Sequence, residues 1–217
     1  LIYTGKVYTE EIKIQVIDYT DDHITELDIT DVAELAQFNN SDSVTWINIQ
    51  GLHDVEVISA IGKLMGLHPL TMEDILDTNQ RPKVEEFEDH LYISMKMINH
   101  VEDLNKIDIE QVSIIAHKNF VICFQEKPGD VFDDIRTRLR NGKGRARKRG
   151  ADYLSYMLID VVIDFYYETL DQVWNKIERL DDLVVRRPDR IELNDIQVIR
   201  RGLIQLRRFM YPVRAVV

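Results

Sequence analysis

The sequence predicts a layered α/β/α domain over residues 1–150, in which helices flank a mixed β-sheet, followed by a long antiparallel helical hairpin over residues 151–217. Strand-like runs with period-two alternation are interleaved with helical runs through the first 127 residues. Two of these strands are joined by His117-Lys118-Asn119, a hairpin turn that makes the sheet mixed. After Gly150, apolar residues recur every three or four positions, which is typical of amphipathic helices.

Five strands are expected in the first domain. Ile12–Ile17 alternates as a half-buried strand does, and Val44–Ile49 is rich in β-branched and aromatic residues. Three further runs have the same character: Leu91–Met97, Gln111–Ala116 and Phe120–Phe124. Cys123 is interpreted as a buried residue of the last strand, since a lone cysteine forms no internal disulfide.

Helices are expected between these strands. Thr30 or Asp31 can cap a helix over residues 32–38, and Asp54 can cap a second over residues 55–65, which Gly66 ends. A short helix is expected after Pro69. This alternation favours one sheet covered by helices.

The helical hairpin begins with a helix predicted over residues 152–187, roughly 50 Å long at 1.5 Å per residue. Pro188 stops it within a tight Arg-Pro-Asp-Arg turn, and a second helix is predicted over residues 191–217, with a kink at Pro212. No stop signal precedes the last residue, and the first residue is not Met. The sequence is therefore expected to be a piece of a longer protein.

The net charge of −11 is unevenly distributed. Residues 1–135 hold 27 acidic and 9 basic residues, whereas residues 136–150 hold 8 basic and no acidic ones. The Asn-Gly-Lys-Gly-Arg core of this stretch is interpreted as a solvated loop after a short helix, and nucleic acid is not expected as a partner. No apolar run reaches the ~18–20 residues that cross a bilayer, and no signal peptide is present, so the chain is expected in the cytosol.

Enzyme motifs are absent from the sequence. It contains no phosphate-binding Gly-x-x-x-x-Gly-Lys-Ser/Thr loop, no Gly-x-Gly-x-x-Gly, no Gly-x-Ser-x-Gly and no His-Glu-x-x-His. The six histidines show no paired helical spacing, and one cysteine excludes a cysteine-based structural zinc site within the chain. No enzymatic activity is predicted.

Two interpretations of the adjacent acids Glu73 and Asp74 stay open. Neighbouring carboxylates repel each other, and a hydrated Mg²⁺ ion that takes one or two of them directly would relieve the repulsion. Alternatively, Thr71 is the N-cap of the short helix, with Asp74 at its third position in a capping box.

A second acidic feature lies along the long helix, where one face carries Asp160, Asp164, Glu168 and Asp171. Such a stripe can hold hydrated cations between subunits, or it can be solvated and paired with arginines of the return helix at positions 200, 201, 207, 208 and 214. Asp160 lies between apolar neighbours in Leu-Ile-Asp-Val-Val, and is therefore expected to need a metal or a neighbouring subunit as its partner.

The segment Gly66-Leu67-His68-Pro69-Leu70-Thr71-Met72-Glu73-Asp74-Ile75-Leu76, with Gln80-Arg81-Pro82-Lys83-Val84-Glu85, resembles the N-terminal cytoplasmic domain of the CorA magnesium/cobalt transporter family. The similarity continues through Tyr153-x-x-x-Tyr156-x-Leu158-Ile159-Asp160 and Leu206-Arg207-Arg208-x-x-Tyr211-Pro212-x-Arg214. It covers nearly the whole chain in the same order.

The resemblance implies a homopentamer in the cell membrane, anchored through helices beyond Val217, whose cytoplasmic part senses Mg²⁺, with Co²⁺ or other divalent cations able to substitute. In that family, ions between neighbouring subunits hold the channel closed. By analogy the metal ligands are Glu73, Asp74 and Asp160, with Asp164, Glu168 and Asp171 as a further acidic stripe. Asn79 stands where some relatives carry histidine.

Three other functions stay open. A related zinc transporter of the same fold would show more histidine or cysteine along this part of the chain. A soluble scaffold would use the helical hairpin to bind a partner, and its acids would serve only to cap and solvate helices. A metal-dependent phosphohydrolase has no motif to support it.

Overall fold

The computed structural model describes residues 1–39, 41–103, 106–142, 144–186 and 193–215. Its elements are, in chain order, β1 Lys13–Tyr19, β2 Ile24–Ile29, the 3₁₀-helix η1 Val32–Phe38, β3 Val44–Gln50, α1 Val55–Leu64, α2 Pro69–Leu76, β4 Lys83–Glu86, β5 His90–Asp103, β6 Lys106–His117, β7 Phe120–Gln125, α3 Asp133–Asn141, α4 Ala151–Arg186, α5 Leu193–Met210 and the 3₁₀-helix η3 Tyr211–Ala215.

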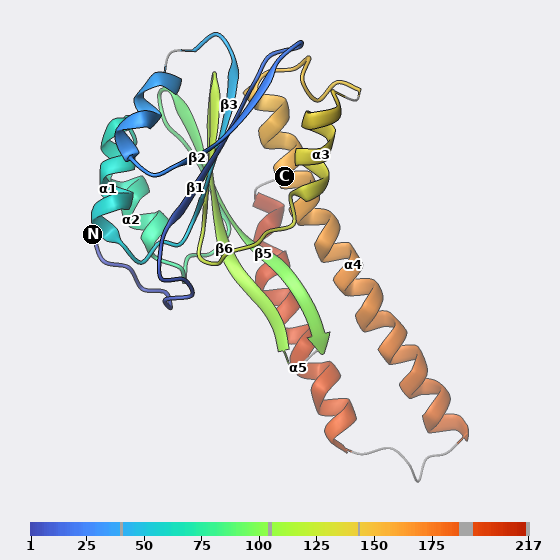
Figure 1. Cartoon of the computed structure of the whole chain (residues 1–217). Helices are drawn as coiled ribbons and strands as arrows, with labels where there is room; N and C mark the ends of the chain where they lie inside the picture. The colour runs from blue at the N-terminus through green and yellow to red at the C-terminus, as the bar shows by residue number, and fades with distance from the viewer. Residues whose placement is uncertain (40, 104–105, 143, 187–192, 216–217) are drawn as a thin grey trace.

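Seven strands form one sheet in the order β2-β1-β3-β7-β6-β5-β4 (Figure 1). Strands β3 and β7 pair in parallel, with Thr45 opposite Phe120, and every other neighbouring pair is antiparallel. The predicted mixed sheet is thus confirmed. All six residues of β7 are buried, because this strand lies in the middle of the sheet with both of its faces covered.

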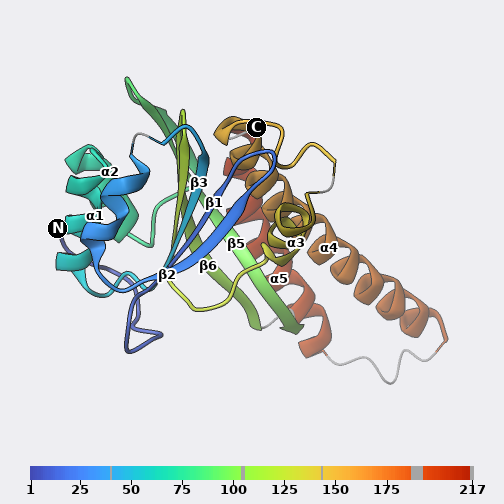
Figure 2. The same cartoon turned by 45° about the horizontal axis from the view of Figure 1, so that its top comes forward.

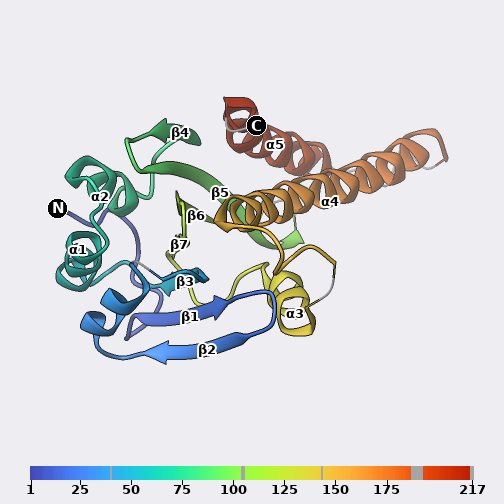
Figure 3. The same ribbon diagram turned by 90° about the horizontal axis from the view of Figure 1, so that it is seen from above.

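Helices cover both faces of the sheet (Figure 3). On one face lie η1, α1 and α2, and on the other lie α3, α4 and α5. Alternation along β3 divides its side chains between two hydrophobic cores: Trp46 packs toward α3 and α4, whereas Ile47 and Ile49 pack toward α1 and α2. The predicted three-layer architecture is confirmed. Cys123 is fully buried in the α4-side core, as predicted.

The predicted N-cap of α1 at Asp54 and its predicted end at Gly66 are both confirmed. The Asp54 carboxylate accepts hydrogen bonds from the backbone N–H groups of Glu56 and Val57, both at 3.1 Å. Gly66 follows the helix with a φ of +71°, a left-handed conformation that glycine adopts without a steric penalty. Asp31 caps the segment over residues 32–38, but this segment is a 3₁₀-helix.

Sequence patterns missed both edge strands. In β2 the middle residues are exposed, and β4 has four residues with alternate exposure. Such edges bury little apolar surface, so they carry only a weak alternation signal. Strands β5 and β6 also extend beyond the predicted runs, and their far end continues past the rest of the sheet (Figures 1 and 2).

The C-terminal helices agree with the predicted antiparallel hairpin. Helix α4 covers Ala151–Arg186 and α5 runs back beside it, with Val173 and Leu206 in the shared core. The Tyr166 hydroxyl of α4 donates to the Lys96 carbonyl, which ties α4 to β5. The predicted Arg-Pro-Asp-Arg turn lies outside the described residues. Helix α5 ends at Met210 and continues as 3₁₀ turns, since Pro212 has no N–H for an α-helical bond.

Candidate functional site

Helix α2 begins earlier than its predicted capping box. Pro69 occupies the first helical position, and the Nδ1 atom of His68 accepts the Leu70 N–H at 3.2 Å. Proline favours this position because its φ suits a helix and its missing N–H would have no partner there. Thr71 therefore lies inside the helix and is fully buried. The prediction that Thr71 is the N-cap is wrong, and Asp74 is not a first-turn acid.

Glu73 and Asp74 lie next to each other on α2 in different surroundings. The Glu73 side chain is exposed, whereas that of Asp74 is 17% exposed. One carboxylate oxygen of Asp74 accepts a hydrogen bond from Gln80 Nε2 at 2.8 Å, and the other lies 2.6 Å from Lys83 Nζ. The described chain therefore already compensates the charge of Asp74.

Lys83 holds two carboxylates, since its Nζ also lies 2.8 Å from Glu85. Desolvation by burial lowers the pKa of Lys83, but hydrogen bonds to Asp74 and Glu85 outweigh it and raise the pKa above its ordinary value. The ammonium group stays protonated at neutral pH, so it links the end of α2 to strand β4.

The acids of α4 form one solvent-exposed stripe: Asp160, Asp164, Glu168 and Asp171. The opposite face of the helix carries Leu154, Leu158, Val162 and Tyr166 into the core. Successive helical residues are 100° apart, so the apolar neighbours of Asp160 point away from it. The apolar setting expected for Asp160 is not found, because its side chain reaches solvent, whereas a metal or a neighbouring subunit as its partner stays a prediction.

The predicted pairing of this stripe with the return helix is absent from the described residues. No carboxylate at positions 160, 164, 168 or 171 lies within ion-pair distance of Arg200, Arg201, Arg207 or Arg208. The side chain of Arg214 lies outside the description. These four carboxylates are consequently open to solvent or to a neighbouring molecule.

The two acidic groups lie on opposite sides of the sheet. Helix α2 packs into the core on one face and α4 into the core on the other (Figure 3). Within the described part of the chain, no three His, Cys, Asp or Glu side chains are grouped so that they could hold a metal ion. Glu73 and Asp160 of one chain therefore cannot share an ion with each other.

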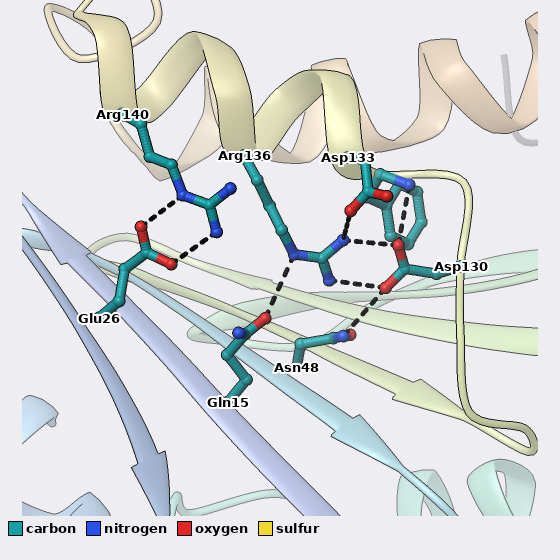
Figure 4. Close-up of polar contacts among 8 residues, drawn as sticks. Gln15, Glu26, Asn48, Asp130, Asp133, Arg136 and Arg140 are labelled. Atoms are coloured by element: carbon teal, nitrogen blue, oxygen red, sulfur yellow. Dashed lines mark hydrogen bonds and ion pairs between the residues drawn. The ribbon is translucent and has the colours of Figure 1, made fainter.

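Sequence patterns missed a buried ion pair between Asp130 and Arg136, the first residue of the basic stretch (Figure 4). Arg136 of α3 is buried, and its guanidinium group lies 2.6 Å from each carboxylate oxygen of Asp130. It also bonds Asp133 at 3.1 Å and lies 5.0 Å from the Trp46 ring centroid. The spacing of three residues between Asp133 and Arg136 could have indicated their ion pair on a helix, but Asp130 precedes α3, so no helical spacing indicated its pairing with Arg136.

This ion pair also shifts the pKa values of both Asp130 and Arg136. Burial by itself would raise the pKa of Asp130, but the hydrogen bonds and the charge of Arg136 hold it below its ordinary value. Asn48 of β3 donates to the same carboxylate at 3.1 Å. At the surface, Arg140 forms two bonds to Glu26 of β2 (Figure 4). These contacts fasten α3 to the sheet, so they are structural, not catalytic.

Among the residues that the structure describes, none of the helices combines the length and the hydropathy required to span a membrane.

Comparisons with known proteins agree with one another. The cobalt/magnesium transport protein CorA of Thermotoga maritima is 42% identical over 216 residues, covering 100% of this chain and 61% of that protein. The full-length CmaX protein shares the fold with a TM-score of 0.76 at 16% identity, covering 98% of this chain and 63% of that one. The soluble domain of CorA from Methanocaldococcus jannaschii has a TM-score of 0.69 at 18% identity, covering 96% and 78%.

The family model described as CorA-like Mg2+ transporter protein matches residues 41–217, which include α2, the acidic stripe of α4 and both C-terminal helices. This family is one of transporters and not of enzymes, in agreement with the absence of enzyme motifs from the sequence. The chain belongs to the family of CorA-like Mg2+ transporter proteins.

Proposed function

We propose that this chain is the cytoplasmic regulatory part of a CorA-type channel for divalent cations, and that it senses Mg²⁺ through carboxylates on neighbouring subunits. The observation that carries the proposal is that α2 and α4 lie on opposite faces of the sheet, and that Glu73 of α2 and Asp160 of α4 are both exposed. In a ring of copies, α2 of one subunit can face α4 of the next. A pentamer at the cell membrane is the assembly that the family resemblance implies.

The comparisons support the class of ion. The T. maritima relative is a cobalt/magnesium transport protein, and this chain covers 61% of its length. Because of this partial coverage, ion transport, a pore and a membrane anchor are parts of the proposed function. The hairpin of α4 and α5 would precede the stalk and the transmembrane helices, and residues 1–150 would form the funnel domain.

The residues present suit hydrated Mg²⁺, which prefers oxygen ligands and keeps several of its waters. Glu73 and Asp160 offer exposed carboxylates, and Asp164, Glu168 and Asp171 extend the acidic face. Asp74 accepts two hydrogen bonds already, but a carboxylate has about four acceptor positions. We therefore assign Asp74 to contacts with the water shell of the ion.

An ion held between subunits acts by mass action. It stabilises the arrangement in which the carboxylates face each other, and its loss removes that stabilisation. Facing acidic surfaces then repel each other, so the subunits separate or shift at low Mg²⁺. A loosely held, hydrated ion suits this role because its occupancy follows the free concentration.

Zinc suits these residues less well. Zn²⁺ prefers thiolate and imidazole ligands, and the described residues bring no such group together. Cys123 is fully buried, and burial raises the pKa of its thiol to about 12, so it is not available as a thiolate. Histidine and cysteine thus give no support to a zinc transporter.

The proposal is tested by titrating the chain with Mg²⁺ while measuring its thermal stability and its sedimentation. Wild-type protein is expected to gain stability and mass, and Glu73→Gln/Asp160→Asn is expected to lose both responses. Asp21→Asn/Asp22→Asn is the control, because it removes the same charge from the exposed turn between β1 and β2. Identical Mg²⁺ midpoints for the wild type and Glu73→Gln/Asp160→Asn would overturn the assignment.

A further inference from the structure

A polar pocket of about 820 Å³ lies where six segments meet, away from Glu73 and from the acidic stripe of α4. The pocket is lined by residues 4–8 near the N-terminus, residues 78–82 after α2, Lys96 of β5, residues 107–110 of β6, residues 126–127 after β7, and residues 204–212 at the end of the chain's last helices. The volume is in the range of small-molecule sites in proteins.

The lining of this pocket is basic, although the chain as a whole has a net charge of −11. Six basic residues line it: Lys6, Arg81, Lys96, Lys127, Arg207 and Arg208. The acidic lining residues are Asp108, Glu110 and Glu126. The pocket therefore concentrates positive charge on a protein whose net charge is negative.

Each of the three acids already forms an ion pair or a hydrogen bond within the protein. Asp108 forms an ion pair with Lys127, and Glu110 accepts the Lys127 backbone N–H at 2.9 Å. Glu126 accepts the Gln111 N–H at 2.7 Å. These contacts leave the acids fixed in place.

The cations at the rim are not compensated in the same way. Among the described residues, no carboxylate lies within ion-pair distance of Lys6, Arg81, Arg207 or Arg208. Deeper in the pocket, Lys96 is 8% exposed and donates to the Thr78 carbonyl at 2.6 Å and to Gln111 Oε1 at 3.1 Å. Burial lowers the pKa of Lys96, and the positive charge of Arg208 lowers it further. The negative charges of Glu126 and Asp77 raise this pKa, but they do not outweigh the effect of burial.

We propose that this pocket binds a polyphosphate anion, either an inorganic polyphosphate or the phosphate chain of a nucleotide. Guanidinium groups bind phosphate oxygens through paired, charge-assisted hydrogen bonds, and the convergence of Arg81, Arg207 and Arg208 supplies several of them. A single orthophosphate would fill a small part of the volume. One exposed ring that lines the pocket, Tyr211, can stack on a nucleobase, whereas the ring of Tyr8 already carries the Lys127 ammonium group 5.0 Å from its centroid.

The pocket touches the segment that holds Asp74. Gln80 lines the pocket and donates to the Asp74 carboxylate, and Arg81 follows it directly. An anion bound at Arg81 would thus contact the same loop that positions α2. The inference rests on this pocket alone and does not require the metal site to exist.

Isothermal titration calorimetry of the full 217-residue chain with tripolyphosphate and, separately, with ATP tests the proposal. Both titrations contain EDTA, so that no divalent cation takes part. Arg81→Gln/Arg208→Gln is expected to weaken binding at least about tenfold, since each charge-assisted bond contributes that much. Arg145→Gln/Lys148→Gln removes the same charge from the exposed segment after α3 and is expected to bind like the wild type.

The two ligands distinguish the sources of the phosphate chain. Equal affinities for the two ligands support recognition of the phosphate chain itself. A higher affinity for ATP that is lost in Tyr211→Ala supports recognition of a nucleotide. Binding weaker than about 1 mM for both ligands would overturn the proposal. Equal losses in the pocket variant and the control variant would do so too, because they would show nonspecific charge attraction.

Discussion

Replacing Arg136 with methionine tests how the buried ion pair of α3 stabilises the fold. The side chains of Arg136 and Asp130 are 8% and 2% exposed, and their charged atoms approach to 2.6 Å. Methionine fills much of the space of the arginine stem but leaves the Asp130 carboxylate without its cation. Breaking a buried pair on one side typically costs about 3–5 kcal/mol.

The same change is expected to lower the melting temperature by roughly 6–20 °C, because about 1 kcal/mol corresponds to about 2–4 °C in a domain of this size. Urea unfolding at neutral pH measures the difference directly. Arg140→Met is the matched control from the same helix. Its partner pair with Glu26 is 49% and 30% exposed, and pairs that exposed contribute about 0–1 kcal/mol.

The pH dependence provides a second measurement. Because the pKa of Asp130 is depressed in the folded protein, its contribution to stability is present above the unfolded value of about 3.9 and is lost as the pH falls through the folded value. In Arg136→Met, burial raises the pKa of this carboxyl instead. The gap in unfolding free energy between wild type and variant should therefore narrow between about pH 5 and pH 2. Equal losses for Arg136→Met and Arg140→Met, or a gap independent of pH, would refute this reasoning.

Three further predictions concern packing, capping and reactivity. Gly62→Ala should destabilise the fold by about 1–3 kcal/mol in urea unfolding, because a Cβ atom there would overlap the buried Met72 side chain; a neutral result would contradict the close packing of α1 on α2. Asp54→Ala should lower stability by about 1 kcal/mol, with Asp54→Ser restoring most of it, since both bonds to the first turn of α1 are lost. Cys123 should resist a thiol reagent at pH 8 and react once urea unfolds the chain, because burial raises its pKa to about 12; fast labelling of folded protein would disagree.

Much of the central architecture followed from local patterns. Val44–Ile49 and Phe120–Phe124 were predicted as strands and form the parallel pair β3 and β7. They were predictable because central strands bury both faces, which concentrates β-branched and aromatic residues in them. The edge strands β2 and β4 were missed, since their pairing depends on a neighbouring strand and not on their own hydrophobicity.

The candidate site shows the same limit. The acidic pair at Glu73 and Asp74 was visible in the sequence, but Lys83, nine residues beyond Asp74, compensates only the second of them. The apolar neighbours of Asp160 suggested burial, whereas rotation along α4 points that side chain to solvent. Exposure depends on which face of a helix packs, and short sequence windows do not contain that information.

The amino-acid sequence by itself determined the layered α/β class, the cap of α1, the left-handed stop at Gly66 and the acidic periodicity of α4, because each depends on residues within a few positions of one another. Only the tertiary structure decided that α2 and α4 lie on opposite faces of the sheet, that Arg136 is buried against Asp130, and that six basic residues from distant segments line one pocket. These features join residues far apart in the chain, and their positions are set by how the layers pack, which local periodicity does not specify.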